Sequence, residues 1–353
     1  MVNLKNLIIA AVAITGMIAT SNLCHSQTVQ TTQIAEFDEL FVVQDTIRLD
    51  QSVLIGRISD LDISVSGELL LVDYVADKVY HFSATGRLLH ELSVVDCHPG
   101  GMPRPHSARF LGDGQLIMWD ARNVSTYLFD SNGQCVKHVK SPDLINISGM
   151  CAHGDRIFAM PIHSSLKAKA FSRDLDLLEE FELEPERWPV LVTSMLVRPG
   201  HSLECFDDGP WYVYIYSMDA TPIGREAGFS RYEPAFFVER KRDIRRPAPT
   251  RLIGANDASI VVGLYRLDNS TRVVVHSRIR HRNKWLSNWG LTIISHKNLF
   301  PSVSVPLFPR KGFKGGANGM LYFQGDHEPL EDGLLGNPEL VRYRFIPPKN
   351  VEE

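Results

Sequence analysis

Ionisable side chains of both signs stand where several strand-like segments of this sequence begin. They are Asp60, His106, Arg109, His201, Glu204, Arg251 and Lys314, with Asp62 and Ser148 at equivalent positions. Carboxylate, imidazole and cationic groups that converge on one point bind polar ligands or a cation. We therefore expect a ligand site if the fold brings the beginnings of these segments together.

Short motifs of known catalytic sites are missing from the sequence. It contains no nucleophile elbow, no phosphate loop, no H-E-x-x-H metal motif and no pair of cysteines spaced C-x-x-C. A site must therefore be assembled from residues that are far apart in the chain, and the fold has to be derived first.

A repeat between residues 58 and 139 indicates the fold. Gly67, Asp73, Tyr80, Phe82 and Gly86 recur 47 positions later as Gly114, Asp120, Tyr127, Phe129 and Gly133. The first copy holds four strand-like segments, at residues 60–64, 69–72, 79–82 and 87–92, with glycine-containing hairpin turns between them. A period of about 45 residues that is filled by four strands is typical of a β-propeller blade.

The same residues resemble a known repeat. The order Asp/Asn-Gly, apolar run, Val-Asp, Val-Tyr-x-Phe and glycine turn is similar to the NHL repeat. Together with the segments 54–58 and 97–101, it resembles the six-bladed propellers that Bacteroidetes-type bacteria export, over residues 40 to 140. The resemblance implies six blades around a central channel, and most of those relatives have no assigned activity.

We accordingly expect an all-β fold, a six-bladed β-propeller of four-stranded antiparallel blades. Six blades of about 45 to 50 residues use nearly the whole chain. The segment 37–49 is expected to be a strand that completes the last blade and closes the ring. The later blades are expected at residues 147–183, 201–239, 252–282 and 292–345. In this fold the ionisable residues named above lie at one mouth of the channel.

Residues 1–26 are expected to be a secretory signal peptide, and residues 27–353 a single propeller domain. Lys5 supplies a positive start, residues 7–19 form an apolar segment that is short for a bilayer span, and small residues follow. We expect an exported chain (periplasmic, outer-membrane-associated or extracellular) whose mature part has no transmembrane segment. The alternatives are a retained anchor and a lipoprotein attached through Cys24, although Leu23 is a poor residue before a lipidated cysteine.

Four more cysteines follow Cys24, at positions 97, 135, 151 and 205. In an exported chain they can form two disulfides. Cys135, Cys151 and Cys205 lie in apolar strand patterns, where cysteine usually serves as a small buried hydrophobic residue. We expect free buried thiols.

Positive charge is concentrated between residues 240 and 284, which hold twelve Lys or Arg against three Asp, although the formal net charge of the chain is −4. This predicts a basic surface with Arg278, Arg280 and Arg282 that attracts an anionic glycan or another anionic envelope component. The alternative is that these arginines alternate along the solvated face of an outer edge strand. Nucleic acid is not expected as a partner, because export separates the chain from it.

We expect a monomeric binding or interaction module at the cell envelope, whose partner is an anionic glycan or an envelope protein, with no catalysis and no cofactor. The alternative is a divalent-metal-dependent hydrolase that resembles the gluconolactonase and strictosidine-synthase-like propellers. That resemblance implies Ca2+ held by oxygen ligands such as those of Asp60, Glu204, Asn256 and Asn318. The positive charges of His106, Arg109 and Lys314 at the same mouth oppose a cation.

Overall fold

The computed structural model describes residues 33–120, 122–140, 147–153, 156–161, 168–181, 192–198, 202–207, 212–217, 222–227, 236–238, 251–253, 259–267, 271–280, 284–295, 303–308, 312–329 and 335–348. All of them belong to one compact unit, Thr32–Glu353. Within them the regular structure is β-strand apart from the helix α2 (Phe37–Leu40), which confirms the all-β class. No described helix has the length and hydropathy needed to cross a membrane. The predicted signal peptide lies outside the described residues and stays a prediction.

The two copies of the sequence repeat form two four-stranded antiparallel sheets. The first contains β3 (Ile58–Ile63), β4 (Leu69–Asp73), β5 (Lys78–Phe82) and β6 (Leu88–Glu91), and the second contains β7 (Pro105–Phe110), β8 (Leu116–Asp120), β9 (Ser125–Phe129) and β10 (Cys135–Lys140). Gly67 and Gly114 form the β3–β4 and β7–β8 turns with φ of 86° and 84°, which glycine adopts without strain. Every residue of β4 and β8 is buried, as expected for strands with a neighbouring sheet on each face. The repeat predicts these blades correctly.

Two further four-stranded sheets follow. One contains β11 (Ile147–His153), β12 (Arg156–Pro161), β13 (Ala168–Ser172) and β14 (Leu177–Phe181), and the other contains β15 (Val192–Arg198), β16 (Ser202–Asp207), β17 (Tyr212–Ser217) and β18 (Pro222–Ala227). The first of them agrees with the prediction. The second does not begin at residue 201 as predicted, because Arg198 of β15 pairs with Ser202 of β16 in an antiparallel hairpin. The sequence pattern misses β15 because Thr193 and Ser194 interrupt its apolar run.

The remaining strands form three sheets. β21 (Ser259–Arg266), β22 (Thr271–Arg280), β23 (Lys284–Ser295) and β24 (Val303–Phe308) are joined by β1 (Gln33–Ile34), which pairs parallel to β24. β25 (Phe313–Ala317), β26 (Met320–Pro329) and β27 (Leu335–Phe345) are joined by β2 (Phe41–Arg48). β19 (Phe236–Val238) and β20 (Arg251–Ile253) pair in a separate two-stranded sheet, so these residues are not strands of a four-stranded blade as predicted. Residues 292–295 end β23 and do not open a blade, because apolar spacing alone does not distinguish one long strand from two.

The N-terminal strand closes the last sheet. β2 runs antiparallel to β27, from Phe41 opposite Phe345 to Arg48 opposite Glu339, which confirms the predicted role of this segment. Residues 37–40 are nevertheless helical and not extended. Glu36 and Glu39 form a capping box at the start of α2, and Phe37 and Leu40, three residues apart, are both buried.

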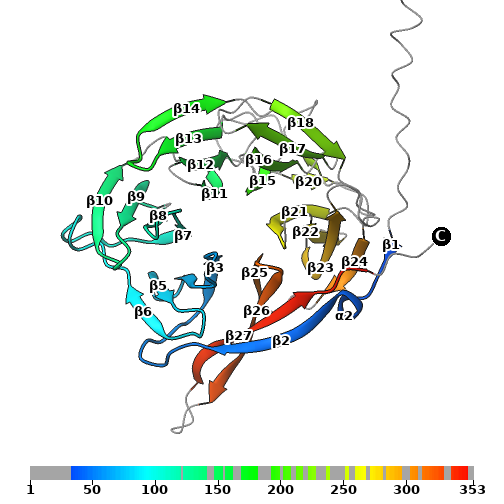
Figure 1. The fold of residues 1–353 in the computed structure, drawn as a ribbon, viewed down its shortest axis with the longest axis horizontal. Coiled ribbons are helices and arrows are strands. Elements are labelled where there is room, and N and C mark those ends of the chain that lie inside the picture. The colour runs from blue at the N-terminus through cyan, green and yellow to red at the C-terminus, as the bar shows by residue number, and fades with distance from the viewer. Residues whose placement is uncertain are drawn as a thin grey trace, which may run out of the picture. The chain divides into compact units, whose positions relative to one another are not determined.

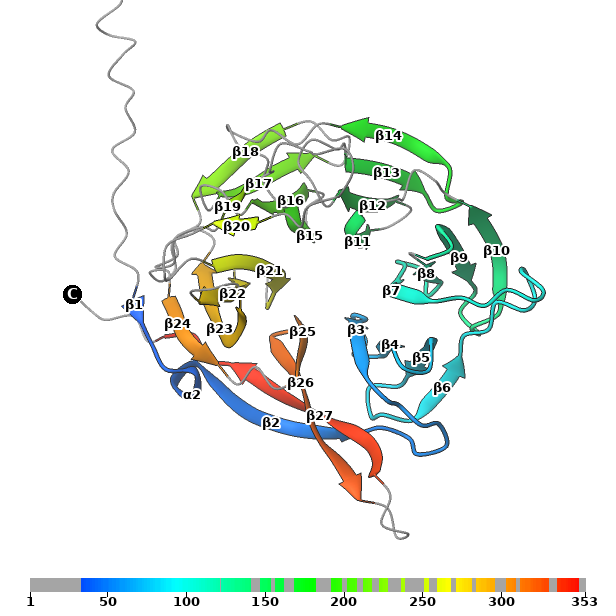
Figure 2. The same cartoon turned by 180° about the vertical axis from the view of Figure 1, so that it is seen from behind.

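The sheets are arranged as blades of a propeller. Figure 1 shows them around a central axis with β3, β7, β11, β15, β21 and β25 innermost, and Figure 2 shows the same arrangement from behind. Neighbouring innermost strands contact one another, and β25 contacts β3. Five of these sheets have four strands and one has five. The predicted propeller of four-stranded blades is therefore confirmed in its architecture.

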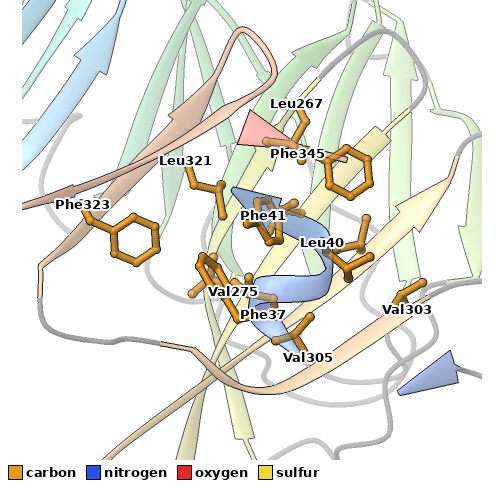
Figure 3. Packing of buried hydrophobic residues seen from close by; sticks show 13 residues of the cluster. Phe37, Leu40, Phe41, Leu267, Val275, Val303, Val305, Leu321, Phe323 and Phe345 are labelled. Carbon is orange, nitrogen blue, oxygen red and sulfur yellow. The ribbon is translucent and has the colours of Figure 1, made fainter. Parts of the chain in front are cut away.

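Hydrophobic cores lie between neighbouring blades. In the core of Figure 3, α2 and β2 bring Phe37, Leu40 and Phe41 together with Val275, Val303 and Val305 of the five-stranded sheet and with Leu321 and Phe323 of β26. Similar clusters join the β2 sheet to the β3–β6 blade, that blade to β7–β10, and β7–β10 to β11–β14. Full burial of such a side chain contributes about 1.5 to 3 kcal/mol. Because each core is shared, each blade depends on its neighbours.

A disulfide contradicts the expectation of free thiols. Cys97, in the connection from β6 to β7, is bonded to Cys135, the first residue of β10, with their Cα atoms 5.7 Å apart. The apolar pattern around Cys135 correctly predicts burial, but it does not reveal which segment packs against the thiol. The bond fixes the connection between two blades to the outermost strand of the second. Cys151 and Cys205 lie on β11 and β16, and their side chains are outside the described part of the chain.

Candidate functional site

Four of the seven predicted site residues lie on innermost strands: Asp60 on β3, His106 and Arg109 on β7, and Lys314 on β25. Glu204 lies on β16, the second strand of its blade, and Arg251 lies on the separate β20, so neither is on an innermost strand as predicted. Both differences follow from the blade boundaries corrected above. His201 lies outside the described residues, as do the side chains of Glu204 and Arg251.

Asp60 and Arg109 form an ion pair between neighbouring blades. Arg109 Nη1 donates to Asp60 Oδ2 at 2.5 Å, and the two side chains are 20% and 21% exposed. Arg109 Nε also donates to the carbonyl oxygen of Met150 on β11 at 2.9 Å, and Nη1 to that of Ala108 at 2.6 Å. This guanidinium therefore joins three consecutive blades.

Asp62 lies two residues further along β3, beside the same guanidinium. Burial raises the pKa of its carboxyl above the ordinary value and Asp60 adds to the rise, whereas Arg109 and backbone donors oppose it. Burial alone would lower the pKa of Arg109, but Asp60 and Asp62 hold it above its ordinary range. Arg109 is thus a permanent cation between two acids.

These polar side chains cap the open edges of the inner strands. β7 pairs with β8 on one side only, so backbone groups on its other side have no partner within the sheet. Asp60 accepts a hydrogen bond from Ala108 N at 3.3 Å, and Asp62 accepts one from Phe110 N at 2.8 Å. Lys314 Nζ on β25 donates to the carbonyl oxygen of Ile58 on β3 at 2.6 Å. The contacts run from β25 to β3, from β3 to β7 and from β7 to β11, so these residues have a structural role whatever they bind.

A second cation stands close to Lys314. Burial and the positive charge of Arg57 lower the pKa of Lys314 to about 8. Arg57 is exposed, in the connection that precedes β3. In the described part of the chain, neither cation has a carboxylate within ion-pair distance. Two like charges in this position disfavour each other, and a bound anion relieves that repulsion.

Tyr265, on β21, belongs to this site although the sequence analysis does not single it out. Burial and the charge of Asp60 raise the pKa of Tyr265 to about 12, against the opposing influence of Arg109. Its ring packs edge-on against Phe313 with the centroids 5.3 Å apart. Because the sequence pattern starts this blade at residue 252, it makes residues 260–265 the second strand of the blade and not the first. Had Ser259–Arg266 been assigned as an innermost strand, Tyr265 would have been included among the predicted site residues.

Other predicted features lie elsewhere. His106 is exposed, and its ring packs edge-on against Trp119 with the centroids 4.9 Å apart. Arg278 and Arg280 lie on β22, which is paired on both sides, so they are not on an outer edge strand as one interpretation requires. Arg282, and the side chains of the other two arginines, lie outside the described residues.

Of the four oxygen ligands expected for a calcium site, only Asp60 and Asn318 have side chains in the described part of the chain. No group of three or more His, Cys, Asp or Glu in the described part of the chain is arranged to hold a metal ion. Asn318 Nδ2 donates to the carbonyl oxygen of Ser64 at 2.9 Å. Asn256 and the side chain of Glu204 lie outside the described residues.

No protein-family model and no curated protein sequence matches this chain. Solved structures do match it. A protein of Bacteroides fragilis NCTC 9343 that is described as exported has a TM-score of 0.60 at 11% identity, over 90% of this chain and 99% of its own. The chain has a β-propeller fold.

Two further propellers are similar at the same level. A member of the DUF4221 family from Bacteroides vulgatus ATCC 8482 has a TM-score of 0.54 at 11% identity, over 87% of this chain and 97% of its own. Virginiamycin B lyase from Staphylococcus aureus has a TM-score of 0.50 at 11% identity, over 87% of this chain and 100% of its own. Identities this low support the fold alone and carry no information about ligand or activity.

Proposed function

We propose that this chain is an exported, six-bladed β-propeller that acts by binding, without catalysis, and receives an anionic group where its inner strands begin. The sixth blade is the five-stranded sheet, in which β21–β24 are the regular strands and β1 is an addition. The cycle of contacts among six innermost strands supports this count. The predicted signal peptide and the likeness to a Bacteroides fragilis protein described as exported support export.

The observation that carries the binding role is the pair of cations Arg57 and Lys314. Arg109 already has two carboxylates beside it, whereas these two have none at ion-pair distance among the described residues. The lowered pKa of Lys314 reflects burial and this neighbouring positive charge. An anion at this position interacts favourably with both cations and restores the pKa of Lys314 toward its ordinary value.

Thermal unfolding of the purified protein tests this proposal. Sodium sulfate and oligogalacturonate serve as anionic probes, with sodium chloride at equal ionic strength as the reference. An anion at a hundred times its Kd stabilises the protein by about 2.7 kcal/mol, which raises the Tm by roughly 4 °C for a domain of this size. Because Lys314 loses its charge above a pH of about 8, the gain in Tm is expected to be larger at neutral pH than at alkaline pH.

A matched pair of variants separates this site from general charge effects. Lys314→Gln is expected to reduce the gain in Tm, whereas Lys140→Gln, at an exposed lysine on the outermost strand β10, is expected to leave it unchanged. An equal gain in the wild type and in Lys314→Gln would contradict the proposal. A Tm that falls with a chelator and recovers with Ca2+ would instead favour the metal-dependent hydrolase.

A further inference from the structure

Three exposed segments meet around Tyr74, next to the beginnings of the inner strands. They are the connection before β3, the β4–β5 turn and the connection before β7. Tyr74 is 51% exposed. The guanidinium carbons of Arg57 and Arg104 lie over its ring, 5.7 Å and 5.9 Å from the centroid, within the range of a cation–π interaction. The Tyr74 surface consists of Leu54, Arg57, Tyr74, Val75, Met102 and Arg104.

Two buried carboxylates hold the backbone of this surface. They belong to the repeat residues Asp73 and Asp120, both 0% exposed. Asp73 accepts hydrogen bonds from the backbone N–H of Gly56 at 2.7 Å and of Arg57 at 3.0 Å. Asp120 accepts one from the backbone N–H of Arg104 at 2.9 Å. Because the backbone of both arginines is fixed before a partner arrives, binding costs less ordering entropy.

Large, exposed apolar side chains stand within three positions of Arg57, Tyr74 or Arg104 in the chain. Leu54 is 68% exposed, Val75 67% and Met102 88%. The Val75 side chain lies directly against Gly56, where an added Cβ would approach it to 2.7 Å. Tyr, Arg and Met are enriched at the centres of protein interfaces, and exposed apolar groups gathered in one place mark contact surfaces.

The six side chains that define the Tyr74 surface include two arginines and no acid. Arg104 Nε lies 3.3 Å from Asp77 Oδ1, whereas Arg57 has no carboxylate at ion-pair distance among the described residues. Lys314 lies close enough to Arg57 for the two charges to interact. An acidic partner is therefore complementary. A sugar ring fits less well, because both guanidinium groups lie over the aromatic ring on which it would stack.

We infer that the Tyr74 surface docks an acidic segment of a partner protein. A carboxylate of that segment is received by Arg57 and Arg104, and apolar side chains beside it pack on Leu54, Val75 and Met102. The inference rests on the proposed function and specifies the class of partner at the same end of the propeller. It also requires Tyr74 and Arg104, which a simple anion held by Arg57 and Lys314 does not, so different variants test the two proposals.

Selection of short random peptides displayed on phage, with the purified protein as the target, tests the inference. The selected peptides are expected to combine Asp or Glu with aromatic or aliphatic residues. Calorimetry with the synthetic peptides is expected to show at least about tenfold weaker binding to Arg104→Glu and to Tyr74→Ala than to the wild type. Arg87→Glu makes the same charge change at an exposed arginine in the β5–β6 turn and is expected to bind them unchanged.

The alternative outcomes overturn the inference. They are selected peptides without acidic residues, acidic peptides that bind Arg104→Glu as tightly as the wild type, and Arg104-dependent binding of polygalacturonate in place of peptides. Tyr74→Ala provides an independent answer if Arg104→Glu does not fold, which its thermal unfolding shows. If the anion-dependent gain in Tm through Lys314 persists in any of these cases, the proposed function stands and the partner class alone is wrong.

Discussion

Replacing Arg109 with methionine removes the cation between two acids and keeps an unbranched side chain of similar length. Asp60 and Asp62 then stand side by side, and the carbonyl groups of Ala108 and Met150 lose a donor. Breaking a buried ion pair costs about 3 to 5 kcal/mol. Because about a fifth of each paired side chain is exposed (20% and 21%), we expect the lower end, about 3 kcal/mol, and a Tm lower by roughly 4 °C.

The loss of stability in Arg109→Met should depend on pH, and Asp62 sets the direction of that dependence. Burial raises its pKa above the ordinary value of 3.8, so the folded protein keeps this proton to a higher pH than the unfolded chain does. Ionisation of Asp62 therefore reduces stability as the pH rises from 3.8 through the folded value. Arg109 opposes this rise, so replacing Arg109 raises the pKa of Asp62 further. The deficit of Arg109→Met is expected to be smaller at about pH 5 than at about pH 8.

Arg342→Met is the matched control for this pH dependence. Arg342 Nε donates to Asp45 Oδ1 at 2.5 Å across β27 and β2. The hydrogen bond from Arg342 lowers the pKa of Asp45 below 3.8, so its stabilisation is complete above 3.8 and is lost only as the pH falls through the folded value. The deficit of Arg342→Met should be constant between about pH 5 and about pH 8. Urea unfolding followed by tryptophan fluorescence measures both variants, and an equal Arg109→Met deficit at the two pH values would refute the reasoning.

Three further predictions concern the fold. Asp73→Ala leaves three backbone N–H groups without their acceptor, at about 1 kcal/mol each, and urea unfolding should show a loss of about 3 kcal/mol. Gly86→Ala should lower the Tm more than Gly114→Ala. An added Cβ would meet a backbone oxygen at 2.1 Å at Gly86, whereas at Gly114 it would meet nothing closer than 3.8 Å. Equal Tm values of the two variants would contradict this packing argument. Removing the Cys97–Cys135 disulfide, whose ends are 38 positions apart, should cost about 4 kcal/mol. Reductant should then lower the Tm of the wild type but not that of the Cys97→Ser, Cys135→Ser double variant.

The first two blades could be predicted because their signals are local. Gly67 and Gly114 form turns that need a positive φ, and Asp73 accepts hydrogen bonds from residues only 16 and 17 positions earlier. β15 offers no such signal, since the polar residues Thr193 and Ser194 interrupt its apolar run. Because the pattern misses this first strand, the predicted boundaries of the later blades are displaced as well.

The same distinction between local and distant contacts applies to the site. The position of Asp60 and Arg109 on inner strands follows from the repeat, because the repeat fixes the order of strands within a blade. Their partners do not follow from it. Lys314 donates to a carbonyl group 256 positions away, and Tyr265 comes near Asp60 only when the blades are assembled. Contacts of this range depend on packing between blades, which apolar spacing does not encode.

The pairing of β2 with β27 joins residues that are 291 to 304 positions apart in the chain. A chain that emerges from the ribosome, or threads through a translocation channel, delivers Phe37 and Phe41 first and Phe345 last. Until the last residues follow, Phe37 and Phe41 lack the C-terminal side chains against which they pack in the core of Figure 3. Their aromatic rings are then exposed and can associate with other unfolded chains. Long-range closure of this kind is slow to form. The last blade can therefore be completed only when β27 is available to pair with β2.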